Sequence, residues 1–394
     1  MANDYCTQVV DDPARIGRAA WNALVDADAE ANPFLRHEFL CALTESGAAA
    51  GPSGWHPRFL LLTRGDEPVA AAPLYAKDHS YGEYVFDWSW AEAYQRYGLA
   101  YYPKWLVAVP FTPVPGRRLL ARDGQARSAL AAALLAQARQ SALSSLHVLL
   151  ATAADIDALA AAGMLVRDGV QFHWRNAGYA DFEQFLAQLA QPKRKKVRAE
   201  RRKVAEAGIV LERKVGRDIS EADWRFFYRC YLATYRAHFS SPYLNLEFFL
   251  RIGASMPEHL MLVLARRGGR PVASALGVFD AQRGEPRLYG RYWGAVERVE
   301  CLHFECCYYQ MIEFAIERRL AWFEGGAQGA HKLARGLDPV PTRSAHWLAH
   351  PAMQEAVARF LERERAGVAA SIDELSEHRA FKVDAFPPAP ERRR

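Results

Sequence analysis

The chain has 394 residues, a net charge of +5 at pH 7, and hydrophobic residues at 51% of its positions. This length predicts two domains of roughly 150 residues or slightly more, and the composition excludes a disordered chain. The longest apolar run, 129–136, is far shorter than the roughly 20 residues that span a bilayer, and the N-terminus lacks the apolar segment of a signal peptide. Six cysteines without a C-x-x-C pair indicate reduced thiols, so we expect a cytoplasmic protein without a metal site.

The first half is predicted to consist largely of strands, with aromatic-rich segments between them. Residues 57–72 (PRFLLLTRGDEPVAAA) predict two strands joined by a glycine-containing turn. Further strands are expected at 83–88 and 105–109. Most aromatic side chains here fit a core, but a few polar residues stand among them and suit the wall of a ligand cleft. These are Lys77, His79, Glu83 and Lys104.

An alanine-rich helix near 128–141 and a strand near 146–151 complete the first half. The join between the halves is expected near 176–180. Antiparallel strands combined with helices indicate mixed α/β units, each a mostly antiparallel mixed sheet flanked by helices. The predicted division of the chain is 1–178, 179–385 and a disordered tail, 386–394.

A strongly basic helix opens the second half. Residues 193–203 hold eight basic side chains and one acid, Glu200, whereas the rest of the chain holds 42 basic and 44 acidic residues. Pro192 can begin this helix and Gly208 can end it. One interpretation is a solvated surface helix; the other is phosphate or nucleic-acid binding, because guanidinium groups make bidentate contacts with phosphate. The candidate phosphate-binding residues are Lys193, Arg194, Lys195, Arg198, Arg201 and Arg202.

A second hairpin repeats the first at an offset of 203 residues. Residues 260–275 (LMLVLARRGGRPVASA) align with 57–72 without gaps. The pairs brought into register include Pro68 with Pro271 and Trp90 with Trp293. The repeat predicts two similarly folded halves, in which 57–110 and 260–325 superpose.

The segment 289–305 (YGRYWGAVERVECLHFE) predicts a strand, a loop and the start of a helix. Apolar residues recur every three or four positions from Leu302 to Ile316, which predicts a buried stripe. Glu305 lies beside this stripe. A carboxylate in such a place is either paired with an arginine or poised for proton transfer.

A glycine-rich loop, FEGGAQGAHKLARG (323–336), follows a short strand. It is not a P-loop, because Lys332 follows a histidine and precedes a leucine. A tight turn with ordinary polar residues is one interpretation. The density of glycines and titratable groups favours a binding or catalytic site, with His331 as a candidate base. Its polar residues are Glu324, Gln328, His331, Lys332 and Arg335.

The chain resembles the FemAB-like branch of the GNAT acyltransferase superfamily, a group described as peptidoglycan biosynthesis or recognition proteins. The resemblance implies a mixed α/β fold of two tandem GNAT-like domains. It is carried by NPFLRHEFL (32–40), GWHPRFLLL (54–62), PLYAKDHSYGEYVFDWSWAEAY (73–94), YYPKW (101–105), PFTPVPGRRLL (110–120), GRYWG (290–294), LHFECCYYQMIEFAI (302–316) and FEGGAQGAHKLARGLDPVPTRSAHW (323–347).

The resemblance also implies an N-acyltransferase. Fem-type transferases move an aminoacyl group from aminoacyl-tRNA to the amine of a peptidoglycan precursor, whereas typical GNAT enzymes use acyl-CoA held by a [QR]-x-x-G-x-[GA] loop. The matching place here, GAVERVEC (294–301), has no glycine beyond Gly294. We therefore expect an amine-bearing acceptor, an acyl donor that is aminoacyl-tRNA or acyl-CoA, and no tightly bound cofactor.

Acyl transfer to an amine needs hydrogen-bond donors for a tetrahedral oxyanion and a group that accepts the ammonium proton. Two alternatives stay open: a non-catalytic module that recognises a glycan, peptide or nucleic acid, and CoA-dependent acetylation of a small amine. The candidate catalytic residues are Glu305, Glu324 and His331. The candidate substrate-binding residues are Arg291, Tyr292, Trp293, Gln328, Lys332 and Arg335, with the four polar residues of the first half.

Overall fold

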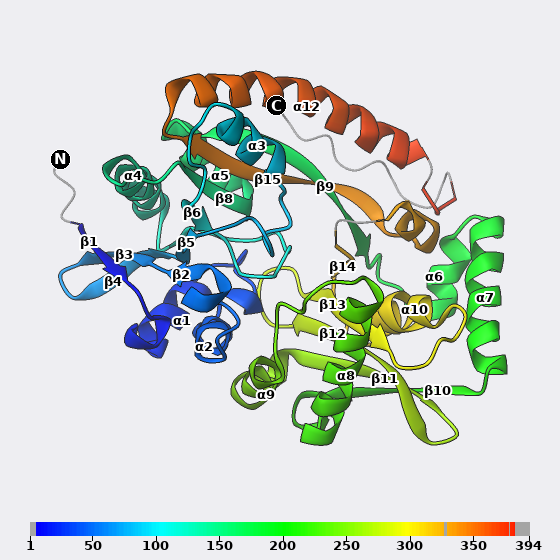
Figure 1. The fold of residues 1–394 in the computed structure, drawn as a ribbon. Coiled ribbons are helices and arrows are strands. Elements are labelled where there is room, and N and C mark those ends of the chain that lie inside the picture. Colours follow the sequence, from blue (N-terminus) through cyan, green and yellow to red (C-terminus); the bar gives the residue numbers. More distant parts are fainter. Residues whose placement is uncertain (1–4, 327–328, 378, 383–394) are drawn as a thin grey trace. The chain divides into compact units, whose positions relative to one another are not determined.

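The computed structural model describes residues 5–326, 329–377 and 379–382, and the chain divides into two compact units (Figure 1). Unit 1 comprises Met1–Gly169, Pro242–Pro257 and Pro341–Ala369, and unit 2 comprises Val170–Ser241, Glu258–Val340 and Ala370–Arg394. The first change of unit, after Gly169, lies close to the boundary expected after residue 178. The sequence did not reveal that the chain enters unit 1 twice more. The tail expected at 386–394 lies outside the described residues, as does Gln328.

Unit 1 contains a four-stranded sheet with the order β1-β3-β4-β7 and further paired strands in the order β15-β8-β6-β5-β2. Strands β9 and β15 and helix α12 each begin in one unit and end in the other. The elements of unit 1 are β1 (Cys6–Val10), α1 (Arg18–Asp26), α2 (His37–Glu45), β2 (Trp55–Pro57), β3 (Phe59–Arg64), β4 (Glu67–Ala72), β5 (Leu74–Lys77), α3 (Trp88–Arg96), β6 (Lys104–Val107), β7 (Leu120–Ala121), α4 (Gly124–Gln140), β8 (Ser145–Ala151), α5 (Ala153–Ala161) and α9 (Leu246–Ser255), with parts of β9 (Leu165–Arg175), β15 (Asp338–Leu348) and α12 (Pro351–Glu377).

Unit 2 is built on strands in the order β10-β11-β12-β13-β14-β9. Its pairs are antiparallel except β13 with β14, which are parallel. Its elements are α6 (Phe182–Gln188), α7 (Gln191–Glu206), β10 (Ile209–Val215), α8 (Glu221–Ala237), β11 (Leu260–Arg267), β12 (Arg270–Asp280), β13 (Arg287–Ala295), α10 (Leu302–Phe304), the π-helical turn η6 (Glu305–Tyr309), α11 (Gln310–Glu317), β14 (Trp322–Glu324) and the 3₁₀ helix η7 (Ala330–Arg335).

The repeated hairpin has the same register in both units. Thr63 pairs with Pro68 and Leu62 with Ala70, so the pairing shifts at Val69. In unit 2 Arg266 pairs with Pro271 and Ala265 with Ala273, so the pairing shifts at Val272. Each shift lies at the same place once the offset of 203 is applied. Proline has no N–H for the ladder and is tolerated beside such a bulge. The prediction of two equivalent hairpins is confirmed.

After the hairpin each unit continues with a strand, a helical segment and a strand, which are β5, α3 and β6 in unit 1 and β13, α10 to α11 and β14 in unit 2, but the offset of 203 no longer holds. Trp90 lies in α3, whereas Trp293 lies in β13, so these two tryptophans do not occupy the same element. The prediction of a strand at 83–88 was wrong, because residues 83–87 lie in neither a helix nor a strand and Trp88 begins α3. Side-chain contacts hold this segment instead, since the Lys104 ammonium pairs with both Glu83 and Asp87.

Each unit has its own hydrophobic core, and the mixed α/β class predicted from the sequence is confirmed. In unit 1 the core lies among β3, β4, β6, β8 and α4. In unit 2 it lies among the sheet, α6 and the helical segment from Leu302 to Ile316. The expected stripe of that segment is buried at Leu302, Cys306, Tyr309, Ile312 and Ile316. Among the described helices, none has the length and apolarity that a membrane span requires.

Candidate functional site

A cavity of about 120 Å³ lies in unit 2 where two parallel strands part. Strand β13 pairs with β14 only from Arg287 to Tyr289, and β14 ends at Glu324. The next residues of β13 then line one wall of the cavity, and Phe323 and Gly325 line another. A ligand in this cavity would therefore lie against the part of β13 that follows its pairing with β14.

Two irregularities shape the walls of this cavity. In the ladder with β12, Ala275 pairs with Trp293 and Gly277 with Gly290, which leaves two residues of β13 opposite Leu276. A bulge of this kind leaves a residue out of the regular ladder and re-aims its neighbours. On the other side stands the π-helical turn η6, whose extra residue per turn is frequent at functional sites. Between them these irregular segments bring Tyr292, Trp293, His303, Cys307 and Tyr308 to the cavity.

A histidine–tyrosine pair stands beside the cavity. His331 Nε2 lies 3.1 Å from the hydroxyl oxygen of Tyr308, which itself lines the cavity. The His331 side chain is exposed, so a substrate can reach it. Gly329 makes room for the ring: its φ is +101°, and a Cβ there would lie 2.2 Å from the imidazole Cε1. The glycine-rich loop predicted as a site thus places His331 against the helical wall.

The groups around the pair are basic. Lys332 is buried, donates a hydrogen bond to the carbonyl of Gly326 at 3.1 Å, and has no carboxylate partner among the described residues. Burial lowers its pKa to about 8. Burial also lowers the pKa of His303 to about 4 and, with the nearby Arg335 and Lys332, lowers that of His331. Both imidazoles are therefore neutral near pH 7, and His331 is able to accept a proton.

The FemAB-like family, described as peptidoglycan biosynthesis/recognition, matches residues 12–383. The match covers more than half of the chain. The chain belongs to the FemAB-like family. No curated protein sequence matches it.

Solved structures with the same fold are known at low sequence identity. The C-terminal DUF2156 domain of a lysylphosphatidylglycerol synthetase-like protein from Agrobacterium fabrum has a TM-score of 0.55 at 11% identity, over 89% of this chain and 97% of that one. FemX has a TM-score of 0.53 at 11% identity, over 86% and 98%. L-PGS from Bacillus licheniformis has a TM-score of 0.54 at 10% identity, over 90% and 99%. The tandem GNAT-like fold predicted for this FemAB-like protein is confirmed.

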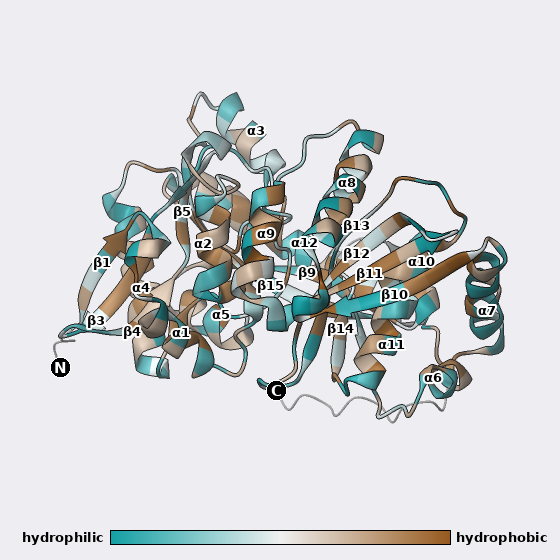
Figure 2. Ribbon diagram, turned by 90° about the horizontal axis from the view of Figure 1, so that it is seen from below, coloured by the Kyte–Doolittle hydropathy of each residue, from teal (hydrophilic) through white to brown (hydrophobic). Residues whose placement is uncertain are grey.

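The basic helix α7 of this FemAB-like protein has two halves that differ in their ion pairs. Figure 2 shows it as a largely hydrophilic helix beside hydrophobic strands of unit 2. Its C-terminal bases have acidic partners: Arg198 with Glu183, Arg201 with Glu305 and Glu313, Arg202 with Glu206, and Lys203 with Glu300. Lys193, Lys195 and Lys196 have no acidic partner in the described part of the chain, and Arg194 donates to backbone carbonyls of Ala187 and Leu189.

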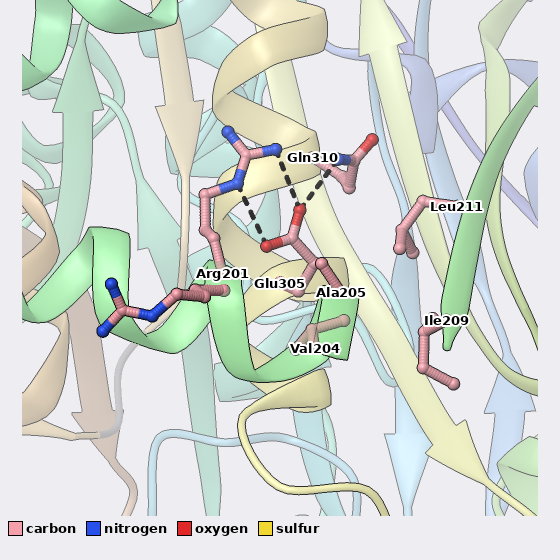
Figure 3. A pocket seen from close by; sticks show the side chains of 8 residues that line it. Arg201, Val204, Ala205, Ile209, Leu211, Glu305 and Gln310 are labelled. Atoms are coloured by element: carbon pink, nitrogen blue, oxygen red, sulfur yellow. Dashed lines mark hydrogen bonds and ion pairs between the residues drawn. The ribbon is translucent and has the colours of Figure 1, made fainter. Parts of the chain in front are cut away.

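Arg201 and Glu305 form a partly buried pair on the wall of a second hollow, of about 410 Å³ (Figure 3). Arg201 donates from Nε and Nη2 to the two oxygens of Glu305 at 3.2 and 3.1 Å, and Gln310 donates to the same carboxylate at 2.9 Å. Burial raises the pKa of Glu305, and Arg201 opposes this shift. The sequence left two roles open for Glu305, and the structure shows the first of them, pairing with an arginine. The catalytic role of Glu305 and the phosphate-binding role of Arg201 stay predictions.

Glu324 also has partners. It is buried at the end of β14, accepts a hydrogen bond from Arg287 Nη1 at 2.9 Å, and lies 3.7 Å from His173 Nε2. Gly325, the next residue, lines the cavity, whereas Glu324 does not. As a base, Glu324 therefore has weaker geometric support than His331.

The four polar residues predicted for a cleft lie in unit 1. Lys104 is fully buried and donates to Ser80 at 2.8 Å and to Glu83 at 2.9 Å. Lys77 is also fully buried, and its ammonium donates to His79 Nδ1 at 2.8 Å. Burial lowers the pKa of Lys77 to about 7 and raises that of Glu83 to about 7. These contacts give the four residues a place in the structure of unit 1, and their role in binding stays a prediction.

Several residues of the site were not predicted. His303 of α10, and Cys307 and Tyr308 of the π-helical turn η6, line the cavity. Glu200, the lone acid of the basic segment 193–203, is buried and pairs with Arg335. One acid among eight bases was the available signal for Glu200.

Proposed function

We propose that this FemAB-like protein is an N-acyltransferase, which joins an acyl or aminoacyl group to an amine acceptor through an amide bond. The observation that carries the proposal is the cavity between β13 and β14, with a bulged strand on one side and the His331–Tyr308 pair beside it. In this reaction the amine nitrogen attacks the acyl carbon, and the ester or thioester bond to the donor breaks. The leaving group and the ammonium then exchange protons with the site or with water.

Each step has a candidate group in the wall of the cavity or beside it. The tetrahedral oxyanion needs donors that are already oriented, and the bulge at Arg291 and Tyr292 suits backbone N–H groups to this task. The attacking amine must lose a proton, and neutral His331 is placed to accept it. Lys332, a buried cation with no carboxylate partner in the described part of the chain, suits an anionic group of the substrate or the developing negative charge.

We further propose that the N-terminal half of α7 holds phosphates of an aminoacyl-tRNA donor. Lys193, Lys195 and Lys196 have no acidic partner in the described residues, and Arg194 stands among them. The Lys196 charge acts on His331, so this part of the helix is electrostatically linked to the proposed base. The exposed pairs of Arg198 and Arg202 are weak, at about 0–1 kcal/mol, and phosphate can compete with them.

The acceptor that we propose is the amine of a peptidoglycan precursor, as the family description suggests. We also propose that the protein acts in the cytoplasm. The six free thiols are compatible with a reducing compartment. The proposal is tested by incubating the purified protein with a labelled aminoacyl-tRNA or acyl-CoA and an amine-bearing precursor. Formation of a labelled amide supports it, and absence of transfer from every donor favours a recognition module.

We expect salt to weaken tRNA binding, and the lysines of the first half of α7 to carry part of this effect. Each lost phosphate contact changes the log–log salt slope by roughly 0.7 for single strands. Replacing Lys193 and Lys196 with alanine is expected to flatten the slope by about one unit or more. The matched comparison is Arg198→Ala with Arg202→Ala on the same helix, which is expected to change the slope less because phosphate must first displace Glu183 and Glu206 from these arginines. An unchanged slope in the lysine variant would return α7 to a solvated surface helix.

We expect acetyl-CoA to bind weakly, because the segment 294–301 lacks the glycines with which a pyrophosphate loop approaches its ligand. Calorimetry should give a Kd of about 1 mM or weaker, equivalent to about −4 kcal/mol. Micromolar affinity, about −8 kcal/mol, would instead favour the CoA-dependent reaction.

A further inference from the structure

Glu200 is the one acid of the basic segment of α7, and it points into unit 2 rather than into solvent. Its residue is 7% exposed. Its carboxylate accepts two hydrogen bonds from Arg335 Nη2, at 2.7 and 2.8 Å, and one from the hydroxyl of Tyr309. The ion pairs of Arg198, Arg202 and Lys203 on α7 are exposed, whereas the Glu200 carboxylate makes its contacts inside unit 2.

Arg335 connects this acid to the glycine-rich loop. It is 1% exposed, and its Nη1 donates to the backbone carbonyl of His331 at 2.7 Å. Its Nε donates to the hydroxyl of Tyr309 at 3.1 Å, and its guanidinium carbon lies 3.5 Å from the centre of the Phe304 ring. The planar guanidinium thus fixes the end of η7 to α10 and η6, and its charge is balanced by Glu200.

The same contacts define where the imidazole of His331 lies. The backbone carbonyl of His331 accepts a hydrogen bond from Arg335, and the imidazole Nε2 of His331 lies beside the hydroxyl of Tyr308. Glycine at position 329 leaves the space that the ring occupies. A shift of η7 relative to η6 would move the imidazole away from the cavity.

We propose that Glu200 is a positioning residue, which through Arg335 holds His331 beside the cavity. Because Glu200 lies on α7, this contact also connects His331 to the basic helix that we assign to donor phosphates. The catalytic meaning of this role rests on the proposed function. The geometric part does not, because the fixed position of His331 is a property of the protein without substrate. Lys196 lies one helical turn before Glu200, so phosphate binding there and the placement of His331 act on the same helix.

The charges that face His331 give the sign of the expected change. Burial, Arg335, Lys332 and Lys196 all lower its pKa, and Glu200 raises it. The ring also faces aromatic and titratable side chains of the helical wall, namely His303, Phe304 and Tyr308. Removing the Glu200 charge leaves the cations unopposed, so the pKa of His331 should fall.

The test compares Glu200→Gln with Glu206→Gln, a change of the same kind at the exposed C-terminal end of α7. NMR of the imidazole nitrogens, assigned with His331→Asn, measures the pKa of His331 in the free protein. We expect the pKa of His331 to fall in Glu200→Gln and to stay unchanged in Glu206→Gln. With a donor and acceptor, kcat should fall by about 10- to 100-fold with a smaller change in KM, and the acid limb of the pH profile should move to lower pH. A pKa and a kcat equal to those of Glu206→Gln would overturn the proposal.

A second variant separates positioning from folding. Glu200→Gln leaves the Arg335 charge buried and unpaired, which destabilises a protein strongly, whereas removing both charges of a buried pair is often tolerated. Glu200→Gln with Arg335→Met is therefore expected to recover the melting temperature but not kcat. Full recovery of kcat in a folded double variant would contradict the proposal. If the wild type transfers no acyl group, the proposed function fails, and the NMR comparison still decides whether Glu200 places His331.

Discussion

Lys104→Met is expected to destabilise unit 1 by about 3–5 kcal/mol, because it leaves two buried carboxylates without their cation. The Lys104 ammonium is fully buried, donates to Glu83 at 2.9 Å, and pairs with Asp87. Burial raises the pKa of Asp87, but Lys104 outweighs it and holds the carboxyl below its usual range. Tyr101 donates to the same carboxylate at 2.6 Å, so the change would also disturb the contacts between β6 and the segment before α3.

Urea unfolding followed by tryptophan fluorescence measures this effect. Lys77→Met is the matched control, since Lys77 is equally buried but has His79, not a carboxylate, as its hydrogen-bond partner. It is expected to cost clearly less than Lys104→Met. Lys195→Met, on the surface of α7, is expected to change stability by about 0.5 kcal/mol or less. Equal losses for Lys104→Met and Lys77→Met would show that burial alone, and not the ion pair, determines the cost.

His331→Asn is expected to lower kcat by about 10²- to 10⁴-fold, the usual contribution of a general base. Asparagine retains hydrogen bonding but cannot accept a proton near neutral pH. Since burial and the neighbouring cations lower the pKa of His331, its basic form predominates from below pH 6.5 upward. The wild-type kcat/KM should therefore rise to a plateau on the acid side of pH 6.5, and the variant should lose this limb.

Steady-state kinetics across pH checks the prediction, with His238→Asn as the control on an exposed histidine of the same unit. His238 Nδ1 donates a hydrogen bond to the carbonyl of Thr234 at 2.8 Å, and His238 does not line the cavity. Activity of His331→Asn within a few-fold of the control, with the acid limb intact, would assign the base to another group. Glu324 is then the next candidate to test.

The sequence predicted the elements whose signals are local. The hairpins were found because proline, glycine and alternating apolar residues recur at a fixed offset, and the structure repeats even the position of the bulge. The helix α7 was found because Pro192 and Gly208 bound a run of helix-forming residues. In each case the nearest residues in sequence determine the conformation.

The candidate site was less predictable, because it depends on contacts between segments far apart in sequence. His331 and the glycine-rich loop were recognised from their residue types. The contact that supports the loop joins Arg335 to Glu200, which are 135 positions apart in the sequence. The π-helical turn that begins at Glu305 has no clear sequence signal, so Tyr308 was not expected at the cavity. The strand expected at 83–88 failed because buried ion pairs to Lys104 override its aromatic and β-branched residues.

The measurement that tests the central claim most directly is acyl transfer by a variant whose cavity is filled. Cys307 lines the cavity of about 120 Å³, and a phenylalanine there would occupy much of it. Cys6→Phe, at an exposed cysteine of unit 1, is the matched control. Transfer of a labelled aminoacyl group from tRNA to a precursor amine should occur with the wild type and Cys6→Phe, and should be lost in a folded Cys307→Phe. Undiminished transfer by Cys307→Phe, with an unchanged melting temperature, would show that the reaction does not take place between β13 and β14.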